Sequence, residues 1–134
     1  MKIERFEEIE SWKGARELTA VIYKMTGMDG FVKDFGLKDQ IQRASVSIMA
    51  NIAEGFDSGT SKSFIIFLKY AYRSPSEVQS LLYVALDCRY ITQNDFDDAY
   101  RKTNDIKNLI WGFIQYLRKK STTTNDEQRT KTLI

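Results

Sequence analysis

The chain has 134 residues, which is long enough for one domain with its own apolar core. It carries 20 lysines and arginines against 18 aspartates and glutamates, so it lacks the large positive excess that marks dedicated nucleic-acid binders. It has no histidine and one cysteine, which excludes histidine-based catalysis, histidine metal ligands and an intrachain disulfide.

No uncharged apolar run approaches the ~18 residues that a membrane-spanning helix needs, and the acidic N-terminal sequence does not resemble a signal peptide. We therefore expect a cytoplasmic protein. One proline and seven glycines in the whole chain predict long helices with few interruptions.

Two helices are predicted in the first half of the chain. The first runs from about Ser11, which can cap its start, to Thr26. The second runs from Leu37 to Glu54, with Gly55 as the residue after its last turn. Its apolar and small residues form two adjacent stripes, one of Ile41, Ser45, Ile48 and Ile52 and one of Val46, Ala50 and Ala53. A helix with this pattern is expected to be buried on several sides.

A long third helix is predicted from near Ser61 to about Tyr90, with apolar residues in heptad spacing on both sides of Pro75. The proline either breaks the helix, with Ser74 capping a new start, or kinks it. We favour one kinked helix because the heptad stays in phase across Pro75.

The fourth helix is predicted to begin after Thr92, which has Asp95 three residues further on, and to run to about Lys120. Its apolar residues repeat every seven positions, as in a bundle seam. The predicted fold is therefore all-α, an antiparallel up-down four-helix bundle of residues 1–120 with the third helix kinked at Pro75. Residues 121–134 have no apolar period, and we expect a disordered tail.

The segment from Gly36 to Leu86 also carries a family resemblance. Its motifs include Gln40-Ile41, Arg43-Ala44, Val46-Ser47-Ile48, Asn51-Ile52-Ala53-Glu54-Gly55 and Ser61-Lys62, with Trp12-Lys13 and Glu17-Leu18 upstream. Over about residues 8–117 the chain resembles the small four-helix-bundle proteins encoded in intervening sequences of bacterial 23S rRNA genes. It departs from their pattern at Gln42, Met49 and Arg73, where arginine, proline and glycine are frequent.

The resemblance implies a four-helix bundle that assembles into homopentamers. A related protein, the accessory variability determinant of diversity-generating retroelements, implies a basic pentameric barrel that contacts nucleic acid and a reverse transcriptase. For most members of the family it implies no established activity.

The best candidate for a nucleic-acid site is a basic stripe on the third helix. Lys62, Lys69 and Arg73 are spaced by seven and four residues, which places them on one face, opposite the apolar stripe. Lys38 and Arg43 are further candidates at the start of the second helix. The alternatives are a solvated helix face for the stripe and, for Arg43, an ion pair with Asp39 or Glu54.

Several large apolar residues of the third helix lie off its core stripe: Ile65, Ile66, Tyr70, Tyr72, Tyr83 and Val84. An exposed patch of this kind predicts a subunit interface. The alternative is that the two neighbouring helices cover these side chains.

No catalytic residue, cofactor, metal ion or small-molecule substrate is expected. The acidic residues near Asp95 suit the positive end of the fourth helix, and Arg118–Lys120 suit its negative end, although they can also extend the basic surface. Cys88 is expected in or near the core. Asn51 is expected to bond to nearby backbone, and Glu54 to pair with an arginine.

Two functions therefore remain open. One is a non-catalytic oligomeric scaffold that contacts RNA or DNA. The other is a protein–protein adaptor without nucleic-acid contact.

Overall fold

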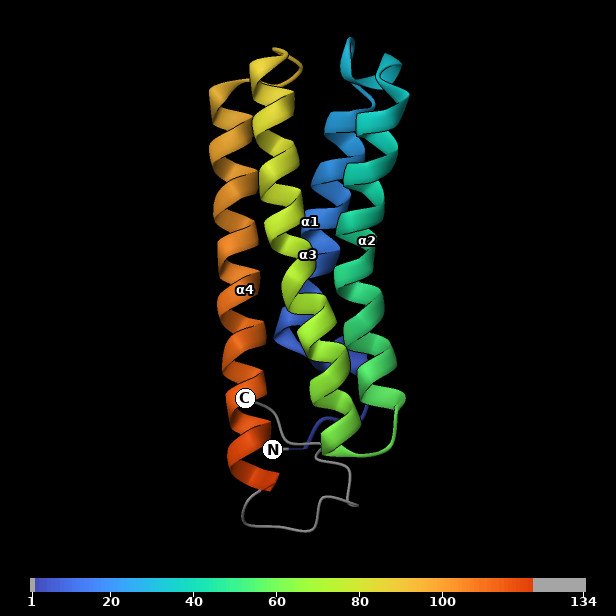
Figure 1. Ribbon diagram of the computed structural model, residues 1–134, viewed down its shortest axis with the longest axis vertical. Helices are drawn as coiled ribbons and strands as arrows, with labels where there is room; N and C mark the ends of the chain where they lie inside the picture. The colour runs from blue at the N-terminus through green and yellow to red at the C-terminus, as the bar shows by residue number, and fades with distance from the viewer. Residues whose placement is uncertain (1, 122–134) are drawn as a thin grey trace.

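The computed structural model describes residues 2–121 and consists of four long helices, α1 (Glu10–Thr26), α2 (Phe35–Asp57), α3 (Ser61–Asp87) and α4 (Gln93–Ser121). Short 3-10 helices, Phe6–Glu8 and Phe31–Lys33, precede α1 and α2, and no β-strand occurs in this range. The helices stand side by side, with the α2–α3 connection at one end and the α1–α2 and α3–α4 connections at the other (Figure 1). The all-α, four-helix prediction is confirmed. The predicted tail lies outside the described residues, apart from Ser121, which ends α4.

Each helix packs against two neighbours, because α1 and α3 both contact α2 and α4. The residues predicted to form the seams of α3 and α4 line one apolar core, to which α3 contributes Phe64, Leu68, Ala71, Val78, Leu82 and Ala85, and α4 contributes Phe96, Ala99, Ile106, Ile110, Phe113 and Leu117. The heptad spacing in the sequence therefore locates the core faces of both helices.

Side chains cap the starts of three helices. Asp34 accepts a hydrogen bond from the Leu37 backbone N–H (3.2 Å) at α2, and Thr60 and Ser63 form a capping box at α3. At α4, the Asp95 N–H donates to Thr92 Oγ1 (3.1 Å) and the Thr92 N–H donates to Asp95 Oδ2 (3.2 Å), which confirms the predicted start.

The prediction that Ser11 caps α1 is wrong. The helix begins earlier, at Glu10 after Ile9, and Ser11 is buried inside the first turn, where its Oγ has no hydrogen-bond partner among the described residues. The cause is the segment before α1, which folds onto the bundle: Ile3 and Ile9 are buried. A short capping signal does not reveal such a tertiary contact.

The prediction that α2 ends before Gly55 is also wrong, since the helix continues to Asp57. Gly55 is buried where α2 meets α3. A Cβ at this position would lie 2.8 Å from Cδ1 of Phe64 and 2.8 Å from Cβ of Phe67. Gly55 therefore permits a close approach of two helices rather than ending one.

The second stripe of α2 is only partly buried, since Ala53 packs half-buried against the core while the other two residues are exposed. Ile48 and Ile52 are fully buried, but Val46 is 39% exposed and Ala50 is exposed. Because α2 packs on only two neighbours, one side of it faces outward. The prediction of a helix buried on several sides is wrong for this side.

The third helix runs as one α-helix through the buried Pro75, so it does not break there. It ends at Asp87, before the predicted Tyr90. Arg89 takes a left-handed conformation (φ 62°), and the Tyr90 N–H donates to the Ala85 carbonyl (2.9 Å). The left-handed residue and this hydrogen bond form a turn that commonly ends an α-helix.

The same turn ties α3 to the start of α2. The Tyr90 hydroxyl donates to Asp34 Oδ2 (3.0 Å), and its ring lies 5.3 Å from that of Phe31. The hydrogen bond to the Asp34 carboxylate, followed by burial, raises the pKa of Tyr90 above its ordinary value.

The contact at Gly55 predicts opposite effects for two glycine-to-alanine substitutions. Gly55→Ala should destabilise the protein by about 1–3 kcal/mol, because Phe67 Cβ cannot move without shifting α3. Gly112→Ala in α4 is the matched control: nothing lies within 4 Å of its added Cβ, so it should stabilise by about 0.5–1 kcal/mol. Urea unfolding of both variants checks this, and a stabilised Gly55→Ala protein would contradict the close approach.

The Tyr90–Asp34 hydrogen bond predicts a pH-dependent stability difference between the wild-type protein and Tyr90→Phe. Because the folded-state pKa of Tyr90 lies above the unfolded one, the bond contributes stability that is fully present below about pH 10 and is lost as the pH rises through the raised pKa. The wild type should therefore be more stable at about pH 8, and the difference should shrink toward about pH 12. Unfolding free energies measured across this range test the prediction, which a constant difference would refute.

Candidate nucleic-acid interface

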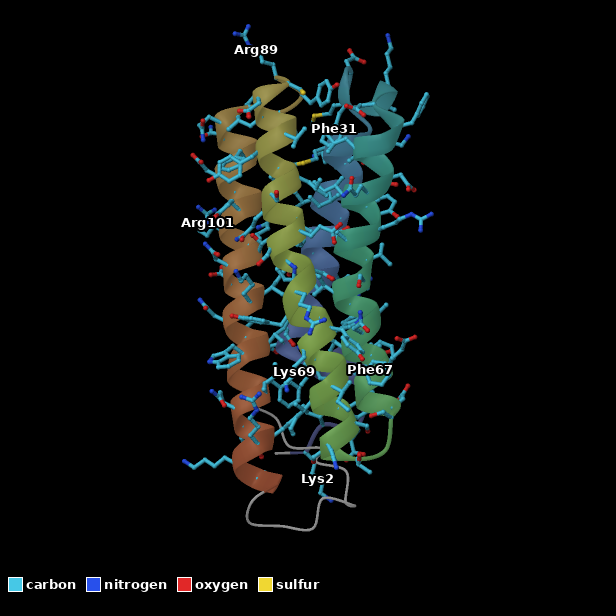
Figure 2. All side chains as sticks on the ribbon, viewed as in Figure 1. Lys2, Phe31, Phe67, Lys69, Arg89 and Arg101 are labelled. Atoms are coloured by element: carbon cyan, nitrogen blue, oxygen red, sulfur yellow. The ribbon has the colours of Figure 1, made fainter. Side chains whose placement is uncertain are left out.

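The three basic residues predicted on α3 lie together on its outer face. Lys62, Lys69 and Arg73 are all exposed, and none takes part in an ion pair within residues 2–121. The guanidinium of Arg73 lies over the Tyr70 ring, 5.9 Å from its centroid. Figure 2 shows Phe67 on the α2 side of α3 and Lys69 on the α4 side. The stripe is therefore accessible and carries unneutralised charge.

Lys38 and Arg43 are not part of this stripe. Lys38 lies near the start of α2, whereas Lys62 follows its end, so about 30 Å of helix separates them. Arg43 Nε donates to Asp39 Oδ2 (2.9 Å), which is the ion pair offered as its alternative role. The Lys38 ammonium lies 5.9 Å from the Phe35 ring centroid. The structure thus separates the five predicted residues into an α3 group and an α2 group.

Between α3 and α4 runs a row of aromatic and basic side chains that extends the stripe. The Tyr72 and Trp111 rings lie 5.7 Å apart. The Lys107 ammonium is 6.0 Å from the Tyr72 centroid and donates to Ser76 Oγ (3.2 Å), and the Arg118 guanidinium is 5.6 Å from the Trp111 centroid. We call these four residues, with Ser76, the α3–α4 seam.

The sequence reasoning missed Lys107 and Trp111 as members of a basic surface. In the sequence they lie 34 to 49 residues from Lys62, Lys69 and Arg73. Their signal is the spacing of residues 107, 111 and 118, which puts all three on one side of α4. Only the register between the two helices shows that this side meets the basic face of α3.

Positive charge is concentrated in these parts of the chain. Four aspartates, Asp87, Asp95, Asp97 and Asp98, lie at the end of α3 and the start of α4, but residues 61–86 and 99–121 hold nine lysines and arginines and only two carboxylates, Glu77 and Asp105. By helix periodicity, neither carboxylate projects from the side that carries Tyr72 or Trp111. Since the whole chain has a net charge of +2, the remainder is net acidic. The modest overall charge therefore hides a basic region.

The residues predicted to form an oligomer interface divide into two groups. Ile66, Tyr70 and Val84 are exposed on the outer face of α3. Ile65 and Tyr72 are half-buried against the core, whereas Tyr83 is 50% exposed even though its ring packs on Phe96 (4.8 Å). Coverage by a neighbouring helix thus applies to Ile65 and Tyr72, and only to one part of the Tyr83 ring.

The remaining polar residues show mainly structural contacts. Asn51 Nδ2 donates to the Ser47 carbonyl (2.9 Å), as expected. Asp98 accepts from Arg101 (2.8 Å). Glu54 is exposed rather than buried. Cys88 is exposed at the end of α3, so its predicted place in or near the core is wrong.

Two further kinds of site can be checked over the described range. No group of three or more histidine, cysteine, aspartate or glutamate side chains is placed to hold a metal ion within residues 2–121. No described helix combines the length and apolar character that crossing a membrane requires.

Comparisons with known proteins agree with the fold. The family model described as 23S rRNA-intervening sequence protein matches residues 7–112. A crystal structure of a protein of unknown function from the S23 ribosomal protein family of Bacteroides thetaiotaomicron VPI-5482 superimposes with a TM-score of 0.71 at 23% identity, covering 78% of this chain and 95% of that one. No curated protein matches. The match to the family model spans most of the chain, and the chain belongs to the 23S rRNA-intervening sequence protein family.

Proposed function

We propose that this protein is a non-catalytic, oligomeric four-helix-bundle scaffold of the cytoplasm that binds nucleic acid through the outer face of α3. The observation that carries the proposal is the row of three exposed basic residues on this face of α3, next to Lys107 and Arg118 of the α3–α4 seam. Lys62, Lys69 and Arg73 expose their charges there without an ion-pair partner among the described residues. Such charges attract a phosphate backbone regardless of its sequence.

The assembly proposed for this scaffold is the homopentamer that the family resemblance implies. Ile66, Tyr70 and Val84 on α3, with Val46 on α2, leave large apolar side chains exposed, and such groups commonly mark an interface. In a ring of identical subunits the basic stripe would recur on each copy, and its electrostatic field would add up.

The architecture that we infer for each subunit is an antiparallel up-down bundle with α3 kinked at Pro75. The alternation of the connections between the two ends of the bundle supports the antiparallel order (Figure 1). Pro75 has no N–H to donate to the Ala71 carbonyl and crowds that carbonyl, which supports a kink. The angle between the two halves of α3 in a crystal structure tests it.

The alternative function is a protein–protein adaptor that does not contact nucleic acid. The apolar residues Ile66, Tyr70 and Val84 favour it, because they lie beside the basic stripe, toward α2, and suit a protein partner equally well.

Salt-dependent binding separates the two functions. Replacing Lys62, Lys69 and Arg73 together by alanine should weaken binding to structured RNA or duplex DNA. It should also flatten the slope of log K against log salt, by roughly 0.7–0.9 for each phosphate that the variant no longer neutralises. Filter binding at ~50 and ~200 mM salt measures this.

The matched control replaces Lys13, Arg16 and Lys24, which removes three exposed positive charges from α1. This variant should retain most of the affinity and the salt slope. Equal losses in both variants would refute a site on α3. Absence of binding by the wild-type protein at ~50 mM salt would leave the adaptor function.

Light scattering tests the assembly. The wild-type protein should scatter with a mass near five times that of its 15.6 kDa chain. Ile66→Glu and Val84→Glu should each reduce this mass, because a buried, unpaired carboxylate is costly in an apolar interface. Leu109→Glu alters an equally exposed apolar residue on α4 and serves as the control. A wild-type monomer at micromolar concentration would contradict the proposed interface.

A further inference from the structure

The α3–α4 seam differs from an ordinary basic surface because its charges alternate with aromatic rings. From Lys107 through Trp111 to Arg118 it extends about 17 Å along α4, with Tyr72 of α3 beside Trp111. Trp111 is 44% exposed, although a side chain so large and apolar is usually buried. A duplex presents phosphates to such a surface but keeps the faces of its bases inside the stack. An unpaired strand presents both.

We propose that the α3–α4 seam binds single-stranded nucleic acid, with an unpaired base stacked on Trp111 and the flanking phosphates bound by Lys107 and Arg118. This inference rests on the proposed nucleic-acid function and specifies the form of ligand that the site takes. Aromatic side chains flanked by cations form the usual platform for unpaired strands, because every base has a π-face and every linkage a negative charge.

The contacts of Trp111 show how a base would be accommodated. The Arg118 guanidinium lies over the Trp111 ring, 5.6 Å from its centroid; this guanidinium is itself solvent-exposed and donates a long hydrogen bond to Gln115 (3.4 Å). A base can replace the guanidinium on the indole, since stacking on an aromatic ring is generally stronger than an exposed cation–π contact. The displaced guanidinium then remains within reach of the adjoining phosphate.

The neighbouring side chains suit the backbone of such a strand. Lys69 lies on the α4 side of α3, the side on which the seam runs (Figure 2), and Lys62 lies two turns nearer the start of α3. The uncharged side chains of Ser76, Asn104 and Gln115 are exposed along the seam. By helix periodicity neither Glu77 nor Asp105 projects from the side that carries Tyr72 or Trp111, so a strand can approach the two rings without meeting them; Glu77 lies instead one turn beyond Arg73 on the basic stripe.

The experiment compares full-length wild-type protein with Trp111→Ala. Fluorescence anisotropy measures the affinity for a labelled unstructured oligonucleotide, as RNA and as DNA, for the matching duplex, and for the same single strand with abasic sites. The wild type should prefer the single strand. Trp111→Ala should weaken its binding about tenfold or more while leaving the salt slope and the duplex affinity unchanged, and Trp111→Phe should restore most of the loss.

The protein also carries a spectroscopic readout. Of its two tryptophans, Trp12 is 9% exposed, so emission quenched by an added single strand comes chiefly from Trp111. The abasic strand should bind about as weakly to the wild type as the intact strand binds to Trp111→Ala, without quenching. Leu109→Ala, an equally exposed position on another side of α4, should bind normally.

The possible failures are distinguishable. If the wild type binds intact and abasic strands equally, or if Trp111→Ala binds single strands normally, stacking at the seam is wrong although nucleic-acid binding stands. If the wild type binds neither strand nor duplex, the proposed function itself fails. If Trp111→Ala lowers the light-scattering mass and strand binding in parallel, the seam is a subunit contact. A difference between the RNA and DNA arms shows which sugar the site accepts.

Discussion

The close contact between α2 and α3 determines which side chains of α3 face outward. At Gly55 the backbone of α2 lies against Phe64 and Phe67, and near the middle of both helices Ser74 Oγ donates to Ser47 Oγ (3.2 Å). These small residues hold α3 at one rotation, with Phe64, Leu68 and Ala71 inward. Lys62, Lys69 and Arg73 then face outward, because they lie on the opposite side of the same helix. The basic surface is thus a consequence of interior packing.

The contact between α3 and α4 sets the register along the second edge of α3. Gln79 is buried and its Nε2 donates to Thr103 Oγ1 and Asn104 Oδ1, both at 2.8 Å. A buried amide tolerates little sliding, because a displaced partner would leave it unsatisfied. One turn further along, the same register places Lys107 at Ser76, and beyond it Trp111 at Tyr72. A polar contact inside the bundle therefore assembles the aromatic and basic row on its surface.

The spacing of apolar residues in the sequence predicted four helices, and the heptad repeat predicted the core faces of α3 and α4, because burial of one side of a helix leaves a period that can be read locally. Local patterns were less reliable where distant chain segments meet. Gly55 was predicted to follow the end of a helix. The structure shows instead that a glycine is needed there because Phe64 and Phe67 of α3 pack against the backbone of α2. Val46 and Ala50 looked buried, because apolar composition does not reveal how many neighbours a helix has. The basic stripe on α3 could be predicted from the spacing within one helix. The place of Trp111 and Lys107 beside that stripe depends on the register between α3 and α4, which the sequence does not show.

The hydrogen bond between Tyr90 and Asp34 has a consequence for how the bundle opens. Asp34 caps the first turn of α2 and also accepts a hydrogen bond from the Tyr90 hydroxyl. Tyr90 lies in the turn that ends α3, next to Arg89 at the end of the molecule (Figure 2). Asp34 and Tyr90 are 56 residues apart in the chain, and the two helix termini beside them therefore share one carboxylate. Fraying at either terminus removes a support from the other, so we expect amide protons in the first turn of α2 and the last turn of α3 to exchange with solvent through a common opening. The shared carboxylate thus couples the two helix ends.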